Sequence, residues 1–205
     1  MSTETKDRII QAAAELFMRN GIRSVSMDDI ASHLAMSKKT LYKWFENKDQ
    51  IVLTSIQQHI AQEESCSQQM PPADNVLEEM FNFMQWHRQM LTNLHPSIFY
   101  DLQKYHPQAW SLFTEHKNTF ILQKVADHLR RGIAEGVFRA DLDVEVLCRL
   151  RIAEIEVCFD NQVFPHRQFE LVHLHTVCLE HFLLGIASLK GHRLINQYRQ
   201  VTEVE

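Results

Sequence analysis

Three lysines, a threonine and a tyrosine lie together between positions 38 and 43, and their side chains suit contact with a nucleic acid. Lys38, Lys39 and Lys43 have no acidic residue among them. Each ammonium can neutralise a phosphate and release a counterion. Thr40 and Tyr42 can donate to phosphates or meet a base edge. The alternative is a solvated lysine-rich helix between two core helices, because a short basic helix alone is a weak signal.

The residues before this basic segment predict a short helix with a defined start. Ser26 is a good N-cap, and Asp29 stands at the third helical position, which is capping-box spacing. Apolar residues then recur at helical intervals and form one stripe, namely Met27, Ile30, Ala31 and Leu34. Ala35–Met36 is expected to form a tight turn.

The basic segment itself is predicted to be a second short helix, held between two neighbours. Ser37 caps it, and Leu41 and Phe45 are expected to face inward. Asn47 caps the next helix, with Gln50 at capping-box spacing. A short helix rich in Lys, Thr and Tyr, braced by an apolar partner, is what a helix-turn-helix places in the DNA major groove.

The segment 7–56 resembles the DNA-binding domain of the tetracycline-repressor (TetR) family. The resemblance rests on the runs IIQAAAELFMRNG and SVSMDDIASHLAMSKKTLYKWFENKDQIV, and within the second on TLYKWF followed by NK. It implies a homodimer that binds a two-fold DNA operator. The candidate DNA-contacting residues are Ser26, Lys38, Lys39, Thr40, Tyr42, Lys43, Trp44 and Lys48.

The turn departs from the family pattern at one position. The chain has Ala35 where the family commonly carries glycine. If Ala35 adopts a positive φ, the conformation costs on the order of 1 kcal/mol, because the Cβ atom crowds the backbone there. The departure concerns the turn geometry rather than the resemblance.

Composition favours a helical protein with charge separated along the chain. Five Gly and five Pro in 205 residues indicate long helices and few turns. Residues 1–50 carry a net charge of +1 and residues 51–205 a net charge of −6. The acidic remainder discourages the rest of the molecule from binding DNA non-specifically.

We therefore predict an all-α fold of about nine helices in two domains. Residues 1–50 form the three-helix helix-turn-helix domain, whose reading motif is about 26–45 and which extends along the fourth helix to about residue 65. Residues 51–205 form the domain for effector binding and dimerisation. Pro71–Pro72 ends the connector. Later helices are expected at about 74–94, 95–105, 108–135, 143–160 and 167–189, and the last dozen residues are expected to fray.

The two final long helices are predicted to form a dimer interface. The run RRGIAEGVFRADLDVEVL resembles the carboxy-terminal half of many regulators in the TetR family, where two such helices pack against their copies as four helices. The helix at 167–189 is apolar nearly all round, so both of its sides must be covered. Val177 and Leu184 are the candidate interface residues, and a buried central helix in a monomer is the alternative.

The resemblance also implies an effector pocket, and an aromatic and Met-rich stretch between residues 80 and 113 is the candidate region. Mostly apolar clefts with a few polar groups are how small-molecule sites are built. The candidate residues are Met84, His87, Phe99, Tyr100, Tyr105, Trp110, Phe113 and Glu154. An acid facing the cavity would favour a cationic ligand. The alternative is that these residues are ordinary core.

Other classes of site find little support. The four cysteines lack Cys-x-x-Cys spacing and are expected to be reduced thiols, and the His residues lack a metal-ligand pattern, so no metal and no cofactor is expected. The sequence contains no recognised enzyme motif and no apolar run of transmembrane length, and we expect no signal peptide. We expect a cytoplasmic, nucleoid-associated repressor with no membrane partner, released from DNA by an apolar or amphipathic effector. The alternative is a helical binding module or small enzyme without a DNA function.

Overall fold

The computed structural model describes residues 3–69 and 73–199, and its chain divides into two compact units. The first unit contains Met1–Gln69 and Asn93–His116, and the second contains Met70–Thr92 and Lys117–Glu205. Neither unit is continuous in sequence, because the segment 93–116 belongs with the N-terminal helices. Pro71–Pro72 and the last residues of the chain, 200–205, lie outside the described residues.

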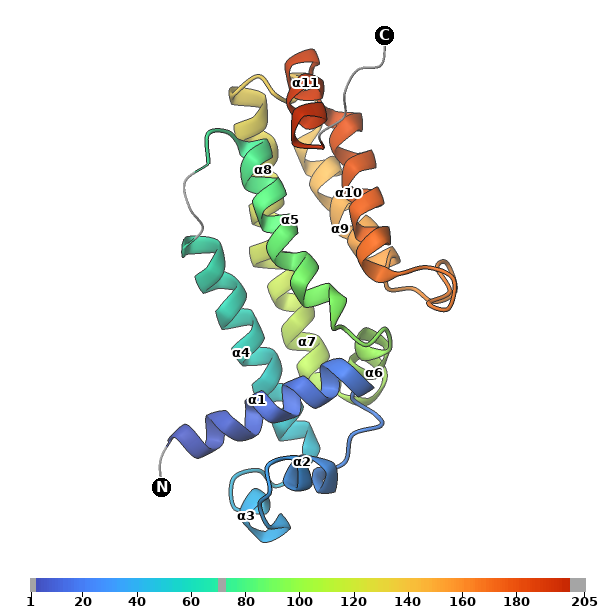
Figure 1. Cartoon of the computed structure of the whole chain (residues 1–205). Helices are drawn as coiled ribbons and strands as arrows, with labels where there is room; N and C mark the ends of the chain where they lie inside the picture. The colour runs from blue at the N-terminus through green and yellow to red at the C-terminus, as the bar shows by residue number, and fades with distance from the viewer. Residues whose placement is uncertain (1–2, 70–72, 200–205) are drawn as a thin grey trace. The chain divides into compact units, whose positions relative to one another are not determined.

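The first unit is built from six helices of the described chain (Figure 1). They are α1 (Thr3–Asn20), α2 (Met27–His33), α3 (Lys38–Tyr42), α4 (Lys48–Gln69), α6 (Ile98–Tyr105) and α7 (Pro107–His116). Gly21, at φ 79°, follows α1 directly, which confirms the left-handed end expected at Asn20–Gly21. Pro107 begins α7 rather than only ending α6, since proline suits the first turn of a helix.

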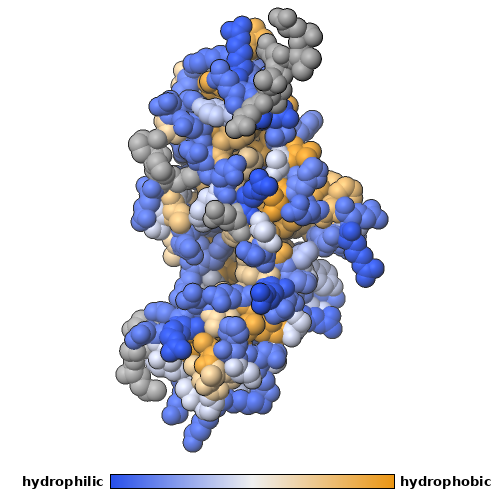
Figure 2. All heavy atoms as spheres, in the orientation of Figure 1, coloured by the Kyte–Doolittle hydropathy of each residue, from blue (hydrophilic) through white to orange (hydrophobic). Residues whose placement is uncertain are grey.

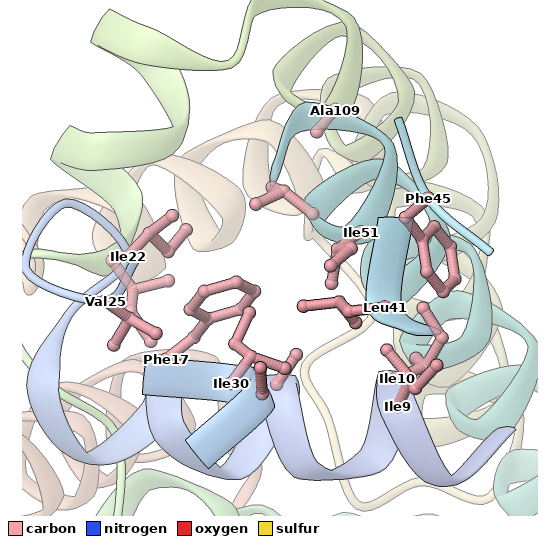
Figure 3. Close-up of a cluster of buried hydrophobic side chains, with 14 of the residues drawn as sticks. Ile9, Ile10, Phe17, Ile22, Val25, Ile30, Leu41, Phe45, Ile51 and Ala109 are labelled. Atoms are coloured by element: carbon pink, nitrogen blue, oxygen red, sulfur yellow. The ribbon is translucent and has the colours of Figure 1, made fainter. Parts of the chain in front are cut away.

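A single apolar core joins α1, α2, α3 and α4. Phe17 from α1, Ile30 from α2 and Leu41 from α3 converge in it together with Ile51 from α4 (Figure 3). Each of these side chains is at most 4% exposed. Burial of one such side chain contributes roughly 1.5–3 kcal/mol. The spacing of apolar residues that predicted these helices therefore also determines which helix faces pack against one another.

Polar contacts attach α6 and α7 to the N-terminal helices of this unit. The buried carboxylate of Asp101 accepts a hydrogen bond from the backbone N–H of Arg23 over 3.0 Å and another from Ser97 Oγ over 3.1 Å. His106 Nδ1 lies 2.6 Å from Asp49 Oδ1, at the start of α4. These contacts explain why residues 93–116 belong to the first unit.

The second unit contains α5 (Val76–Thr92), α8 (Leu122–Ala134), α9 (Val144–Val157), α10 (Leu171–Ile186) and α11 (Leu189–Tyr198) (Figure 1). Its core brings together large apolar side chains from all five helices and from the segment after α8, including Leu77, Leu129, Phe138, Leu183 and Ile195. Asp143 caps α9 as predicted, because its side chain accepts a hydrogen bond from the N–H of Val146 over 3.1 Å.

Two helix predictions were wrong. The long helix expected at 108–135 is interrupted by the π-helical segment η1 (Lys117–Ile121) between α7 and α8, and the boundary between the two units falls at its start. A single π-helical turn changes the helical spacing of apolar residues only slightly, so the sequence pattern did not reveal the interruption.

The second error concerns the end of the chain. The last dozen residues, 194–205, were expected to fray, but 194–198 form the second half of α11, which begins after Ser188. Ser188 Oγ accepts a hydrogen bond from the N–H of Gly191 over 3.1 Å, and Ile195 is fully buried. One apolar residue per turn and a good N-cap suffice to dock a helix that is otherwise polar.

Candidate DNA-binding surface and effector region

The basic helix α3 is held to the core by one face and presents the other to solvent. Leu41 is fully buried and Phe45, just beyond the helix, is 3% exposed, which confirms that both face inward. Tyr42 is 50% exposed, and Lys39 and Lys43 are exposed as well. Neither lysine forms an ion pair within residues 3–69 and 73–199. Their ammonium groups are therefore available to an anionic partner.

The turn before α3 has the positive φ at Ala35 that the sequence analysis considered. Ala35 has φ 51°, and it alone among the described non-glycine residues has a positive φ. The N–H groups of Ala35 and Met36 donate to the carbonyls of Ser32 and Ala31 over 3.1 and 3.0 Å. The end of α2 is thus closed as it would be with glycine, while an alanine bears the steric cost.

Both short helices of the motif begin at the predicted caps. Ser26 Oγ accepts a hydrogen bond from the N–H of Asp29 over 3.2 Å, and Asp29 Oδ2 accepts one from the N–H of Ser26 over 2.8 Å. Hydrogen bonds from Ser26 hold the pKa of Asp29 below its ordinary value. At α3, Ser37 Oγ accepts from the N–H of Thr40 over 3.1 Å.

Two of the candidate contact residues already have partners beside the exposed face. The hydroxyls of Thr40 and Ser37 lie 2.8 Å apart, and Thr40 is half-buried. Lys38 forms an ion pair with Asp28 from α2. Both side chains of that pair are more than half exposed, so solvent weakens the attraction and a phosphate can compete for the lysine.

The last two candidate DNA-contacting residues, Trp44 and Lys48, have partly buried side chains. Trp44 is half-buried and packs against the apolar core of the first unit. The Nζ of Lys48 donates to the carbonyls of Ile22 and Val25 over 3.1 and 3.0 Å. Burial lowers the pKa of Lys48, while Asp49 and Asp101 act in the opposite direction. The structure gives Lys48 a supporting contact that its sequence position did not indicate.

The segment that carries these residues matches a known family of DNA-binding domains. Residues 9–54 match the model of the bacterial regulatory proteins of the tetR family. This N-terminal segment is therefore a DNA-binding domain of the TetR type. The helix-turn-helix built from α2 and α3 lies inside the matched segment.

Individual relatives agree with this assignment. YvaF of Bacillus subtilis, an uncharacterized HTH-type transcriptional regulator, is 31% identical over 105 residues, which span 50% of this chain and 55% of that protein. The transcriptional repressor KstR2 of Mycolicibacterium smegmatis is 26% identical over 70% of this chain and 72% of its own. A putative transcriptional regulator from Saccharomonospora viridis, solved in complex with choline, shares the fold with a TM-score of 0.70 at 20% identity, over 91% of this chain and all of that one.

Apolar side chains are exposed on α9 and α10, the helices for which a dimer interface was predicted. On α9, Val146 is 58% and Leu150 48% exposed, four residues apart on one face. On α10, Val177 is 48% exposed, whereas Leu184 is half-buried against the core. Figure 2 shows apolar side chains over α10 and the base of the loop that precedes it. Of the two predicted residues, Val177 is the more exposed.

The predicted effector residues fall into two groups. Phe99, Trp110 and Phe113 lie together in the first unit, where Phe113 is 5.3 Å from Phe99 and 5.8 Å from Trp110 between ring centroids. Tyr100 and Tyr105 are 54% and 38% exposed in the same unit. The ammonium of Lys104 lies over both tyrosine rings, and the guanidinium of Arg23 lies over that of Tyr105.

The remaining three, Met84, His87 and Glu154, belong to the second unit. Glu154 pairs with Arg151 over 3.3 Å, and Met84 packs against the core. His87 stacks on Phe83 at 5.4 Å between ring centroids.

Sequence reasoning missed two buried polar groups in this neighbourhood. Arg151 is 8% exposed, and its guanidinium lies over the ring of Phe182. The Nε2 of His175 is buried without a hydrogen-bond partner in the described chain. Burial, with His87 and Arg151 nearby, lowers the pKa of His175 to about 4. Both residues stand on helices that read as mainly apolar in the sequence, which is why only Glu154 of α9 was named among the candidate pocket residues.

Within residues 3–69 and 73–199, no set of three or more His, Cys, Asp or Glu side chains is arranged to hold a metal ion. Over the same residues, no helix combines the length and apolar character needed to cross a lipid bilayer.

Proposed function

We propose that this regulator is a cytoplasmic, homodimeric repressor that binds a two-fold operator on chromosomal DNA and leaves it when a small amphipathic molecule binds its C-terminal domain. The observation that supports DNA reading by α3 is the contrast between buried Leu41 and exposed Tyr42, Lys39 and Lys43 on one short helix. The DNA-binding domain is proposed at residues 1–50, with its continuation along α4, and the effector and dimerisation domain at residues 51–205.

The DNA contacts divide by chemistry. Lys39 and Lys43 neutralise phosphates and contribute affinity without reading sequence, whereas Tyr42 and Thr40 contact base edges or thymine methyl groups. Ser26, Lys38, Trp44 and Lys48 complete the proposed surface. In a symmetric dimer the two copies of α3 enter successive major grooves, roughly 34 Å apart along the DNA.

We place the dimer contact on the exposed apolar face of α9 and α10. Val146 and Leu150 on α9 and Val177 on α10 are the residues that a second copy would cover. Apolar side chains that repeat at helical spacing on a water-facing surface are stabilised by such burial. A closed two-fold contact between identical faces also supplies the symmetry that a two-fold operator requires.

For the effector we propose the interior of the second unit, beside His87, Arg151, Glu154 and His175. These polar groups stand among Phe83, Trp86, Phe159 and Phe182, and a few polar groups in aromatic surroundings are typical of small-molecule sites. The Saccharomonospora viridis relative binds the cation choline. In this chain the carboxylate of Glu154 already pairs with Arg151, so we favour a neutral amphipathic ligand over a cation.

Selection of DNA sites from a random library, followed by release with a compound panel, tests the proposal. We expect enrichment of a palindrome, and a lowering of operator affinity by about 5- to 150-fold with an active compound, since allosteric coupling is typically about 1–3 kcal/mol. A library that enriches no site, together with a cofactor found in the purified protein by mass spectrometry, would favour a binding module or enzyme instead. Release by a metal ion or a phosphosugar alone would refute the proposed effector class.

A further inference from the structure

Two cysteines that are twenty residues apart in the sequence meet inside the second unit. Cys158 caps the end of α9, and Cys178 lies in the second turn of α10. Their sulfur atoms are 3.6 Å apart, and the Cys158 thiol is placed to donate to the Cys178 sulfur. Both are free thiols. A disulfide requires a separation of about 2.05 Å, so the two sulfurs need to approach by roughly 1.5 Å.

The surroundings make the two thiols unequal. Cys158 is fully buried, whereas Cys178 is half-buried, so an oxidant from solvent reaches Cys178 first. The guanidinium of Arg151 is close enough to interact with both sulfurs. Burial, followed by the hydrogen bond with Cys178, raises the pKa of Cys158 to about 12. Cys158 is thus suited to be the second thiol to react, because it lies next to Cys178 and can attack that sulfur once Cys178 has been oxidised.

We propose that Cys158 and Cys178 are a reversible modification site, at which a small hydroperoxide converts the thiol pair into a disulfide that links the end of α9 to α10. Cys178 attacks hydrogen peroxide as a thiolate, the O–O bond breaks, and hydroxide leaves, so that Cys178 becomes a sulfenic acid. The sulfur of Cys158 then attacks that of Cys178; the S–O bond breaks, the S–S bond forms, and the departing hydroxide takes the proton of Cys158. The two thiols lose two electrons and two protons, and the peroxide is reduced to two waters.

The inference does not depend on DNA binding or on the effector. It does concern the helices on which we place the dimer contact, since a disulfide would join α9 to α10 within one protomer. Val177, the exposed neighbour of Cys178, points to solvent, while Cys178 packs toward Cys158. A hydroperoxide is small enough to react where a larger thiol reagent is excluded.

Peptide mapping of the full-length protein after treatment with hydrogen peroxide tests the site. Remaining thiols are alkylated in denaturant, and the chain is digested with trypsin without reduction. We expect the peptides 152–167 and 168–190, which carry Cys158 and Cys178 and no other cysteine, to appear as one linked species that dithiothreitol separates. If both peptides instead carry the alkyl label, or if Cys178 is found as a sulfinic acid while Cys158 is alkylated, the proposal is overturned.

The other two cysteines supply matched controls. Cys66→Ser on α4 and Cys148→Ala on α9 should leave the linked species unchanged, because neither sulfur has a cysteine partner in the described chain. Cys158→Ser should abolish it and leave Cys178 to form a sulfenic acid that dimedone traps. An intramolecular link between other cysteine peptides in that variant would show that peroxide oxidises thiols here without selectivity.

Discussion

The side-chain nitrogen of Lys48 lies 3.0 Å from the backbone carbonyl oxygen of Val25, and this hydrogen bond ties the start of α4 to the residues that lead into α2. A second hydrogen bond, to the carbonyl of Ile22, completes the connection. Lysines that look equivalent in sequence, Lys43 and Lys48, therefore have different roles in the structure. The first is free of partners in the described chain and exposed, and the second supports the fold of the reading domain.

Substitution of the two lysines should separate these roles. Lys43→Ala should weaken DNA binding for all sequences and reduce the slope of log K against log salt by about one unit, with stability within about 0.5 kcal/mol of wild type. Lys48→Ala should lower the free energy of unfolding by about 1–3 kcal/mol, because two partly buried carbonyls lose their donor. Fluorescence anisotropy over a salt series and urea unfolding measure the two effects. Equal stability of both variants would contradict the assignment of Lys48.

Tyr42 should contribute to operator affinity through its exposed ring and hydroxyl. Tyr42→Ala should weaken specific binding by about 1–3 kcal/mol if the side chain reads a base, while the fold is retained because the ring is half exposed. Tyr42→Phe separates the hydroxyl from the ring. A mobility-shift assay with the selected operator and with a scrambled duplex checks this. An equal loss on both duplexes would assign Tyr42 to phosphate contact instead.

The turn at Ala35 should be a site where glycine stabilises the protein. Ala35→Gly removes the Cβ crowding at φ 51° and should raise the free energy of unfolding by about 1 kcal/mol, or the melting temperature by about 2–4 °C. Ala61→Gly, at an exposed position within α4, is the matched control and should cost up to about 1 kcal/mol. Thermal melts of the pair provide the comparison. The same sign for both substitutions would mean that Ala35 is not strained.

A charge on the exposed face of α10 should prevent dimer formation. Val177→Glu should give monomeric or insoluble protein, because the buried glutamates would face each other across a two-fold contact without partners. Ala61→Glu, an equally exposed change on α4, should leave the oligomeric state unaltered. Light scattering after gel filtration distinguishes the species. A soluble Val177→Glu dimer would place the interface elsewhere, and Leu184→Glu is less informative because Leu184 also packs against the core.

The buried imidazole of His175 should make stability depend on pH. Its pKa in the folded chain is lowered to about 4, so between pH 6.5 and pH 4 the unfolded chain binds a proton that the folded chain does not. The contribution of His175 is therefore fully favourable above pH 6.5 and is lost as the pH falls, by at most roughly 2 kcal/mol at pH 5.

His175→Gln should remove this part of the pH dependence. Urea unfolding of wild type and variant at pH 7 and pH 5 measures it, and the difference between the two proteins isolates His175 from other groups that titrate. His59 and His128, whose pKa values are also lowered by burial, remain in both proteins. Identical losses of stability in wild type and variant would show that His175 is protonated with little cost in the folded state.

The DNA-reading segment was readable in sequence because its geometry depends on local interactions. The caps at Ser26 and Ser37 act within three residues, so their patterns predicted the observed helix starts, and the same holds for Asp143 at the start of α9 in the second unit. The inward positions of Leu41 and Phe45 follow from helical periodicity alone. Even the strain at Ala35 was foreseeable, because a tight turn of this kind requires a positive φ at that residue whatever its type.

Longer-range features were decided by the tertiary structure. The inclusion of residues 93–116 in the first unit depends on contacts such as Asp101 with Arg23, which are 78 positions apart. The π-helical segment leaves little trace in the apolar pattern, and α11 depends on a single buried face that its polar residues conceal. No local rule indicates which distant element will cover a given surface.

By itself, the sequence determined the helix-turn-helix, the exposed basic residues of α3 and the resemblance of residues 9–54 to a TetR-type DNA-binding domain, because each of these is encoded by residues within a few turns of one another. Only the tertiary structure decided that Lys48 supports the backbone, that Arg151 and His175 are buried near Glu154 and His87, and that Cys158 meets Cys178. The physical reason is that these relationships arise from packing between separate helices. The position of one helix against another depends on the shape of the whole core rather than on any short run of residues.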